Sequence, residues 1–480
     1  MQNNLGELQT FSIASDDAKA KKRIDVGYYQ PFFEHIVKKV AGSKFELQKL
    51  EDITLLISNG RTPSKDMYDE DNDQDGSVPI IKAGTASGRF VNLEKLEYAK
   101  ADFSSGKKAQ KSDIFILSAA HQASYVGKNV SILEVEPKQD TYFVGELICV
   151  RANPEKVLPE YLFGFLSSEV GYFLLNREKR GQTSHIYPED IKSILLPVPS
   201  LKDQKNIVSI LMNAYGQKRK KETEILKILS SIDDFVLGEL GIDMPRGGAE
   251  RVFQIWSDEI EGRIDALFYK PYLRSLLEQI KNKKHFALGQ AIADMSGGAT
   301  PKVTGDYYSD EGGVPFLRVQ NITEMGIKLD DVKFIKPEIH ETMLKRSQLK
   351  KDDLVFTITG RIGSVAVVPD NFEGNINQHS VRFHLQNEVD KTKVLPEFVA
   401  SFFNTKIGRE LSFRSTTGGT RPALDYKALK NLIVPLPSVA KQEKIIAGVN
   451  TIYEKARRLR QEAESIVAGA EKQIEQMIMA

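Results

Sequence analysis

Polar side chains of the types that contact nucleic acid gather in glycine-containing loops of this 480-residue chain. Arg and Lys can bind phosphate oxygens or guanine, Asn and Gln can pair with adenine, and Gly lets the backbone approach a duplex closely. The candidates in the first half of the chain are Arg61, Lys65, Lys82, His121, Gln122, Tyr125, Lys128, Arg180, Gln182, Thr183, Ser184 and His185. The candidates in the second half are Arg318, Gln320, Asn321, Arg361, Asn377, Gln378, His379, Arg414, Thr416, Thr417 and Arg421. Each loop taken alone is also typical of an ordinary polar turn.

No sequence motif for catalysis accompanies these loops. The chain lacks GxxxxGK[ST], GxGxxG, HExxH, GxSxG and the Asn/Asp-Pro-Pro-aromatic tetrapeptide of amino-methyltransferases. Its 7 histidines show no ligand spacing. The string Asp71, Asp73, Asp75 matches the opening of a calcium-binding EF-hand loop, but Lys82 stands where the loop needs a bidentate Glu. We therefore predict no catalytic residue and no metal ligand on this chain.

The composition is that of an ordinary soluble protein. Lys and Arg total 66 and Asp and Glu total 65, so a net charge of +1 argues against a strongly cationic nucleic-acid coat or a membrane-surface protein. A single cysteine, Cys149, excludes a disulfide within the chain and a cysteine-based zinc site. The first residues lack the apolar core of a signal peptide, and no run approaches roughly 18 apolar residues. We expect a cytoplasmic protein.

The sequence contains a tandem repeat. RIDVGYYQPFF from Arg23 returns as RIDALFYKPYL from Arg263, and VLPE from Val157 returns unchanged from Val394. PVPSLKDQKNI from Pro197 matches PLPSVAKQEKI from Pro435. These matches keep their order at nearly constant spacing, so the chain consists of two tandem copies of about 240 residues, which indicates duplicated domains and not a solenoid. The candidate loops recur in both copies with different side chains, as expected of a binding scaffold whose contact residues vary.

Each copy begins with a mixed α+β part, residues 40–200 and 280–436. Short β-branched or aromatic runs bounded by turn residues predict strands. In the first copy these runs are 78–82, 114–117, 130–135 and 143–150. In the second copy they are 314–319, 354–358, 365–368 and 381–385. A helix with a proline in its first turn is expected to follow in each copy, at 160–175 and 397–413.

A long helix is expected to end each copy. Apolar residues recur at spacings of three and four in the second copy, at Ile445, Val449, Ile452, Ala456, Leu459, Ala463, Ile466 and Ala470. This pattern is typical of a coiled-coil seam, although a helix packed on its own domain is the open alternative. Connectivity would then make the two helices an antiparallel coiled coil with one globular domain at each end. Ser200 and Asp203 predict a capping box at the first helix start.

Together these features resemble the specificity subunits of type I restriction–modification systems. The resemblance covers nearly the whole chain and rests on the duplication, the Gly-Thr/Ser loops, the Pro-x-Pro-Ser…Gln helix starts and the heptad helices. The usual Glu-Gln at the helix start is Asp203-Gln204 in the first copy and Lys441-Gln442 in the second.

The resemblance implies a fold and a function. The chain would comprise a first target-recognition domain (1–199), a central helical region (200–262), a second target-recognition domain (263–436) and a C-terminal helical region (437–480). Each target-recognition domain would read one half of a bipartite, asymmetric DNA site. The coiled coil would set the spacer and dock two adenine methyltransferase subunits, which bring S-adenosylmethionine. Two translocase–nuclease subunits would bring ATP and magnesium, and this chain would catalyse nothing.

Two other functions remain open from the residues alone. A two-headed adaptor could use the same polar loops to bind polypeptides. A divergent single-chain DNA methyltransferase or nuclease would need cofactor loops that the sequence lacks.

Overall fold

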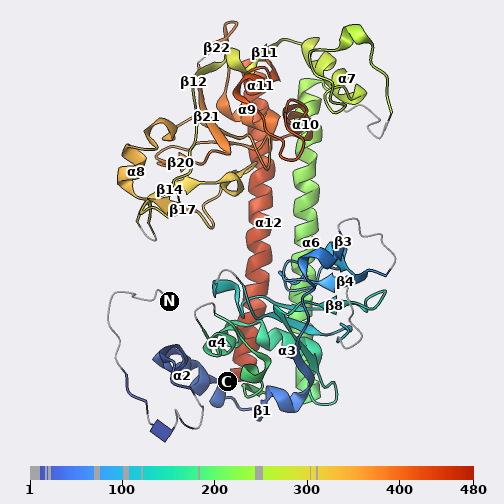
Figure 1. Cartoon of the computed structure of the whole chain (residues 1–480), viewed down its shortest axis with the longest axis vertical. Coiled ribbons are helices and arrows are strands. Elements are labelled where there is room, and N and C mark those ends of the chain that lie inside the picture. The colour runs from blue at the N-terminus through green and yellow to red at the C-terminus, as the bar shows by residue number, and fades with distance from the viewer. Residues whose placement is uncertain are drawn as a thin grey trace. The chain divides into compact units, whose positions relative to one another are not determined.

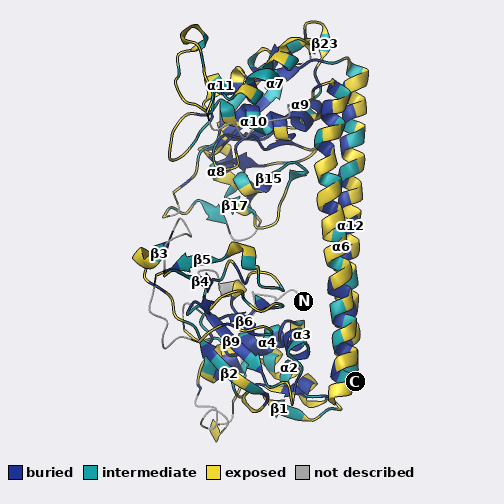
Figure 2. Cartoon of the chain, turned by 90° about the vertical axis from the view of Figure 1, so that its right-hand side faces the viewer, coloured by how far each residue is buried: buried dark blue, intermediate teal, exposed yellow. Residues whose placement is uncertain are grey.

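The computed structural model divides the chain into two compact units. It describes residues 11–13, 15–16, 19, 23–69, 76–100, 107–120, 123–181, 184–243, 252–302, 304–309, 312–386 and 388–479. The first unit comprises Met1–Lys220 with Glu462–Ala480, and the second comprises Lys221–Gln461. Each unit has its own hydrophobic core, dark blue in Figure 2. The predicted fold class, two tandem mixed α/β domains each followed by a long helix, is confirmed. The finer four-part division stays a prediction.

Two four-stranded sheets form the framework of the first unit (Figure 1). The first sheet is antiparallel and has the order β2 (Thr54–Asn59), β9 (Leu147–Ala152), β6 (Ile114–Leu117), β7 (Val130–Ile132). In the second sheet β4 and β8 are parallel, and the order is β3 (Tyr68–Asp69), β5 (Glu97–Ala99), β4 (Val78–Ile81), β8 (Tyr142–Phe143). A separate antiparallel pair joins β1 (Leu47–Lys49) to β10 (Leu195–Pro197).

The second unit repeats this framework. Its antiparallel sheet has the order β12 (Ile292–Gly297), β21 (Ser380–Leu385), β18 (Leu354–Thr357), β19 (Val365–Val367). Its mixed sheet has the order β13 (Tyr308–Ser309), β17 (Lys333–Ile335), β14 (Val314–Leu317), β20 (Asn375–Ile376). The small two-stranded pairs are β11 (His285–Ala287) with β24 (Ile433–Pro435), β15 (Ile322–Thr323) with β16 (Gly326–Ile327), and β22 (Glu388–Val389) with β23 (Thr392–Lys393).

One predicted strand, residues 143–150, is wrong as a single element. The chain leaves β8 at Phe143, turns through Val144, Gly145 and Glu146, and enters β9 in the other sheet. The residues of both strands that fall within this run are buried, so the run is apolar on either side of the turn and carries no periodicity that would reveal the break. The other predicted runs each contain one strand, at most a few residues shorter or longer.

Each predicted helix of the α+β parts is in fact two helices. The elements are α3 (Pro159–Leu166) and α4 (Glu169–Arg177) in the first unit, and α9 (Pro396–Phe403) and α10 (Lys406–Arg414) in the second. Ser168 caps α4 by accepting from the Gly171 N–H at 3.1 Å, and Thr405 caps α10 by accepting from the Gly408 N–H at 3.1 Å. The apolar spacing continues across the break, so only the caps mark it.

Shorter helices complete both units. They are α2 (Pro31–Ala41) and α5 (Pro188–Ile191) in the first, and α7 (Pro271–Lys281), α8 (Pro337–Glu341) and α11 (Tyr426–Lys430) in the second.

Two long helices, α6 (Leu201–Leu240) and α12 (Val439–Met479), confirm the predicted helix after each domain. Ser200 Oγ accepts a hydrogen bond from the Asp203 N–H at 3.2 Å, so Ser200 caps α6 as predicted. The Asp203 carboxylate accepts from Ser200 Oγ at 2.7 Å and not from the Ser200 backbone N–H that the predicted capping box requires. None of the helices in the described part of the chain combines the length and the apolar character needed to cross a membrane.

Within the second unit the two long helices run antiparallel. Lys444 Nζ lies 2.7 Å from a Glu239 oxygen, and Lys455 Nζ lies 3.7 Å from a Glu224 oxygen, so the partner's number falls as α12 advances. Beside the second of these ion pairs the helices share a small apolar cluster of Ile225, Ala456 and Leu459. In the first unit the helices contribute to one core through Ile207, Leu211, Tyr215, Ile474 and Ile478. The regular interlocking of a coiled coil along the full length stays a prediction.

A buried glutamine joins α6 to its domain. Gln204 is fully buried, and its Oε1 accepts from the Leu158 N–H at 2.7 Å. Its Nε2 donates to the carbonyl oxygens of Pro199 at 2.8 Å and Lys156 at 3.3 Å. The helix start is thereby fixed to the backbone that leads into α3.

The second unit contains the same joint. Gln442 is fully buried, accepts from the Leu395 N–H at 2.9 Å, and donates to the carbonyl oxygens of Lys393 at 2.8 Å and Pro437 at 3.1 Å. Two of the repeated sequence motifs, VLPE and the Gln-containing helix start, are therefore the two sides of one structural contact.

Candidate nucleic-acid interface

A closed loop follows α4 in the first unit and α10 in the second. In the first, Arg180 and His185 exchange backbone hydrogen bonds of 2.8 and 2.9 Å. In the second, Thr417 and Ala423 exchange two hydrogen bonds of 2.9 Å, so residues 418–422 project as a loop with its base closed. These loops are the Gly-Thr/Ser segments that the sequence singled out.

The exit of each loop is fixed to the end of a central strand. Ile186 N–H donates to the Ser118 carbonyl at 3.0 Å, just beyond β6, and Leu424 N–H donates to the Ile358 carbonyl at 2.9 Å, just beyond β18. The closed loop therefore lies at the same edge of the antiparallel sheet in each unit.

A second loop meets this edge in the first unit. A Cβ atom at Gly60 would collide with the Phe143 carbonyl oxygen, so only glycine allows the close approach of the two segments. Thr62 Oγ1 donates to the Glu146 carboxylate at 2.8 Å and accepts from the Gly145 N–H at 2.9 Å. Asn59, at the end of β2, donates through Nδ2 to the Gly145 carbonyl at 2.7 Å.

The second unit builds the same edge with other side chains. Gly298 takes the place of Gly60, since a Cβ atom there would collide with the Ile376 carbonyl oxygen. Thr300 Oγ1 donates to Gln378 Oε1, and Gln378 Nε2 donates to His379 Nε2 at 3.1 Å. The proton of a neutral His379 then lies on Nδ1, which is 2.6 Å from Thr359 Oγ1.

The backbone of the two edges is alike while the side chains differ. The Ser118 N–H donates to the Glu146 carbonyl at 2.9 Å, and the Ile358 N–H donates to the His379 carbonyl at the same distance. Glu146 and His379 therefore occupy equivalent places. A carboxylate only accepts hydrogen bonds, whereas an imidazole can donate one as well, so the two edges differ in what they can contact.

The repeated Arg-Ile-Asp turn supports the closed loop of the first unit. Arg23 pairs with Asp25 at 2.8 Å and donates to the Lys179 carbonyl at 2.9 Å. Its guanidinium also lies 4.3 Å from the centre of the Tyr28 ring.

The same turn supports the loop of the second unit. Arg263 pairs with Asp265 at 2.6 Å and donates to the Thr416 carbonyl at 2.7 Å. In each copy, the first repeated motif thus fixes the segment that leads into the closed loop.

Arg414, a predicted DNA contact, has a local role in the structure. Its guanidinium stacks 3.6 Å from the Phe268 ring centre and donates through Nε to the Phe268 carbonyl at 2.6 Å. Burial lowers the pKa of Arg414 from its ordinary value. Arg177 stacks at 4.0 Å on Tyr28 in the first unit, so the position is a repeated structural arginine. These local contacts account for Arg414 without a DNA ligand.

Several other predicted cations form ion pairs within their own unit. The pairs, each given with its acidic partner, are Lys82 with Glu97, Arg180 with Asp190, Arg318 with Asp331, and Arg361 with Glu324. Gln320 also donates to Asp331, at 3.3 Å. These pairs hold the loops in place and leave part of each cation exposed.

Three predicted polar contacts are buried. Asn321 is fully buried, accepts from the Arg318 N–H at 2.9 Å and donates to the Lys328 carbonyl at 2.9 Å. Asn377 accepts from the His379 N–H at 3.2 Å, and Thr416 donates to the Phe413 carbonyl at 2.7 Å. These side chains hold turns, which explains their polarity without a ligand.

The remaining predicted residues divide into exposed, partly exposed and undescribed ones. The exposed ones are Lys65, Tyr125, Lys128, Thr417 and Arg421, and Arg61 is exposed with its N–H bonded to the Phe143 carbonyl. Ser184 and His185 are partly exposed, and the His185 ring stacks on Tyr187. Outside the described residues lie His121, Gln122, Gln182, Thr183 and the acidic string Asp71, Asp73 and Asp75.

Sequence reasoning pointed to the loops that contain Asn59, Thr62, Thr300 and Thr359 but did not name these side chains as contacts, and it missed Glu146. The signal for two of them was present, because Thr62 and Thr300 stand at the same place in the two copies. Glu146 was missed because it lies inside the run misread as one strand.

Comparison with known proteins identifies the family. The family model described as "Type I restriction modification DNA specificity domain" matches residues 42–234 and 281–466, one match for each copy. The chain belongs to this family. The resemblance inferred from the sequence is confirmed.

Relatives in the family share modest sequence identity with this chain. The "Type I restriction enzyme EcoBI specificity subunit" of Escherichia coli is 23% identical over 289 residues, which are 59% of this chain and 56% of that protein. The "Putative type I restriction enzyme MjaX specificity subunit" of Methanocaldococcus jannaschii is 22% identical over 443 residues, 88% of this chain and 90% of that protein. The matched region thus spans little more than half of the first relative and most of the second.

Solved structures from the family give low similarity scores. The S subunit of the type I restriction–modification system from M. genitalium is 13% identical, with 91% of this chain and 96% of that chain covered and a TM-score of 0.39. The HsdS subunit from Thermoanaerobacter tengcongensis is 17% identical, with 91% and 95% covered and a TM-score of 0.32.

Proposed function

We propose that this chain is the DNA-recognition subunit of a type I restriction–modification complex, and that each unit reads one half of a bipartite, asymmetric site. The repetition of one loop frame with different side chains supports this proposal most strongly. Two readers with the same backbone and different hydrogen-bonding groups suit two different half-sites.

The proposed contact surface comprises fewer residues than the sequence analysis predicted. In the first unit it comprises the sheet edge around Thr62 and Glu146 with the closed loop of that unit. In the second unit it comprises the edge around Gln378 and His379 with the closed loop there. Exposed Lys65, Tyr125, Lys128 and Arg421 are the proposed contacts at its margin. The ion-paired cations can exchange their carboxylate for a phosphate when DNA arrives, so they belong to the phosphate-contacting set.

The chain itself is proposed to be non-catalytic and cytoplasmic. Methylation would come from two methyltransferase subunits with S-adenosylmethionine, and cleavage from two translocase–nuclease subunits with ATP and magnesium. The long helices would set the distance between the half-sites and help to dock the methyltransferases.

An exposed isoleucine stands at the same place in both units, which supports the proposal that the chain binds two copies of one partner. Ile24 and Ile264 are each 90% exposed and follow the arginine of the repeated turn. The carbonyl of Arg23 accepts from the Tyr29 hydroxyl at 3.1 Å, and that of Arg263 accepts from the Tyr269 hydroxyl at 2.6 Å, so the same hydrogen bond closes the turn in both units. A single exposed apolar residue is ordinary, but the same one held at the same place twice fits two copies of one partner. We propose that each anchors one methyltransferase subunit.

Ile24→Asp is expected to reduce the stoichiometry from two methyltransferase subunits per chain to one, and the double variant with Ile264→Asp should bind neither at the same concentration. Burying an isoleucine contributes about 1.5–3 kcal/mol, which corresponds to roughly a 10- to 100-fold change in affinity at each site. Mass photometry of the mixed subunits measures the stoichiometry directly.

Val135→Asp is the matched control, since Val135 is also exposed and lies outside the repeated turn. It should leave two methyltransferases bound. If Ile24→Asp and Ile264→Asp behave like this control, the anchors lie elsewhere.

The test of the proposed function is methylation sequencing of a host with and without the gene. We expect one bipartite adenine-methylated motif to disappear when the gene is deleted and to return when it is restored. An unchanged methylome, together with duplex binding that does not weaken steeply with salt, would favour the two-headed protein adaptor instead. Methylation by the purified chain alone would favour the single-chain enzyme.

A further inference from the structure

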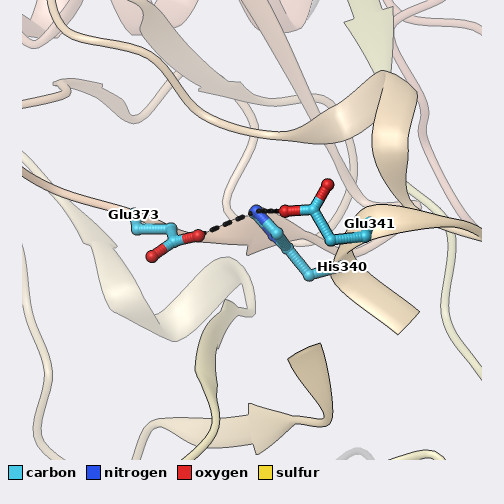
Figure 3. Close-up of side chains that lie close together, drawn as sticks. All are labelled: His340, Glu341 and Glu373. Atoms are coloured by element: carbon cyan, nitrogen blue, oxygen red, sulfur yellow. Dashed lines mark ion pairs between the residues drawn. The ribbon is translucent and has the colours of Figure 1, made fainter. Parts of the chain in front are cut away.

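A histidine and two glutamates meet beside the mixed sheet of the second unit. His340 and Glu341 end α8, and Glu373 precedes β20 (Figure 3). The carboxylates of both glutamates point toward the imidazole in Figure 3, and one ligand atom from each of the three residues lies within 4.8 Å of the others. Sequence spacing gave no sign of this cluster, because Glu373 comes from a distant segment of the chain.

The orientation of the imidazole is fixed by a buried amide. Asn375 is fully buried, and its Nδ2 donates to the Leu344 carbonyl at 2.9 Å and to Ser347 Oγ at 3.2 Å. Its Oδ1 therefore faces His340 Nδ1, which must carry the proton and donate. An imidazole held this way by a carbonyl oxygen presents its other nitrogen, Nε2, as an acceptor or a metal ligand.

Nε2 of His340 is aimed at the two carboxylates. It lies 3.1 Å from Glu373 Oε1 and 3.8 Å from Glu341 Oε1. The His340 side chain is only 5% exposed, whereas the Glu373 and Glu341 side chains are 68% and 66% exposed. The buried nitrogen is thus fixed, while the exposed carboxylates can rotate to meet an ion.

We propose that His340 Nε2, Glu341 and Glu373 bind one divalent transition-metal ion, for which Zn²⁺ is the probe. One imidazole and two carboxylates form a three-ligand set that Zn²⁺ accepts, with a remaining position for water. The cluster borders an open cavity of about 490 Å³, which gives an ion and its water room to enter.

The bound ion would connect α8 to the segment that enters β20. β20 leads directly into Asn377, Gln378 and His379, so the ion would fix the base of a proposed DNA-contacting loop. In the first unit the strand pairing puts Tyr142 at the place of Asn375, so the amide that orients His340 has no counterpart there. The site therefore belongs to the second unit and does not depend on the proposed DNA recognition.

The test is calorimetric titration of Zn²⁺ into the full chain after chelation and dialysis. The parent chain is expected to bind Zn²⁺ and to melt at a higher temperature with it. Glu373→Gln and Glu341→Gln should each weaken this binding roughly tenfold or more, because each removes a ligand. Glu338→Gln is the control, because it removes the same charge from an exposed position of the same helix without removing a proposed ligand, and this variant should bind Zn²⁺ as the parent does.

His340→Gln should abolish binding at this site, but the loss of a buried side chain also affects folding. Glu373→Gln decides the matter, since its side chain is exposed. If the parent chain binds no Zn²⁺, or if Glu373→Gln and Glu341→Gln bind it with the parent's affinity, the proposal is overturned. The cluster is then an ion pair between an imidazolium and two carboxylates only.

Discussion

Gln442→Leu is expected to lower the free energy of unfolding of the second unit by about 2–4 kcal/mol. Leucine has a similar volume but cannot accept from the Leu395 N–H or donate to the carbonyls of Lys393 and Pro437. Each backbone group left without a partner in the partly buried joint costs about 1–3 kcal/mol, less where water can reach it. Urea unfolding followed by hydrogen exchange and mass spectrometry separates this unit from the other.

Lys441→Ala, at the exposed neighbouring position, is the control and should leave the free energy of unfolding within about 0.5 kcal/mol of the parent's. Gln204→Leu should have the same effect on the first unit, because its three hydrogen bonds are equivalent. If exchange of the amides around Leu395 were as slow in Gln442→Leu as in the parent, the glutamine joint would contribute little.

Exchange of residues 280–436 for the same part of a relative with a different target is expected to replace one half of the methylated motif completely. The physical reason is that the second unit has its own core and its own sheet edge with proposed DNA contacts. Its loops should therefore keep their conformation when they are joined to the long helices of another chain. The other half of the motif should be unaltered. Methylation sequencing of a host carrying the hybrid gene gives both halves in one measurement.

The reciprocal exchange of residues 40–200 is the matched control and should alter only the other half. A hybrid that changed both halves, or neither, would contradict the assignment of one half-site to each unit. A hybrid with no methylation at all would be examined for folding by hydrogen exchange before the outcome is read.

Several elements were predicted correctly because their signals are local. The heptad spacing around Ile445 and the cap at Ser200 need only neighbouring residues, and α12 and α6 begin and continue as expected. The tandem duplication was likewise visible from short sequence matches that keep their order. The two predicted helices that proved to be four failed because Ser168 and Thr405 cap a second helix inside an unbroken apolar pattern.

The DNA-contacting residues were harder to predict than the elements. Arg414 and Arg421 flank one loop and have the same chemistry, yet one stacks on Phe268 and the other is exposed. The partner of Arg414 is 146 residues away in the chain, so no local pattern distinguishes the two arginines. Asn321 was assigned to DNA for the same reason, although its amide holds a turn of its own unit.

The sequence by itself determined the duplication, the mixed α/β class, the long helices and the family, because repeats, caps and apolar periodicity are written along the chain. Only the tertiary structure decided which polar side chains hold the loops and which face outward, since a hydrogen-bond partner is defined by proximity in space. It also brought His340 of α8 and Glu373 together beside Asn375 of β20, a contact that no spacing in the sequence encodes.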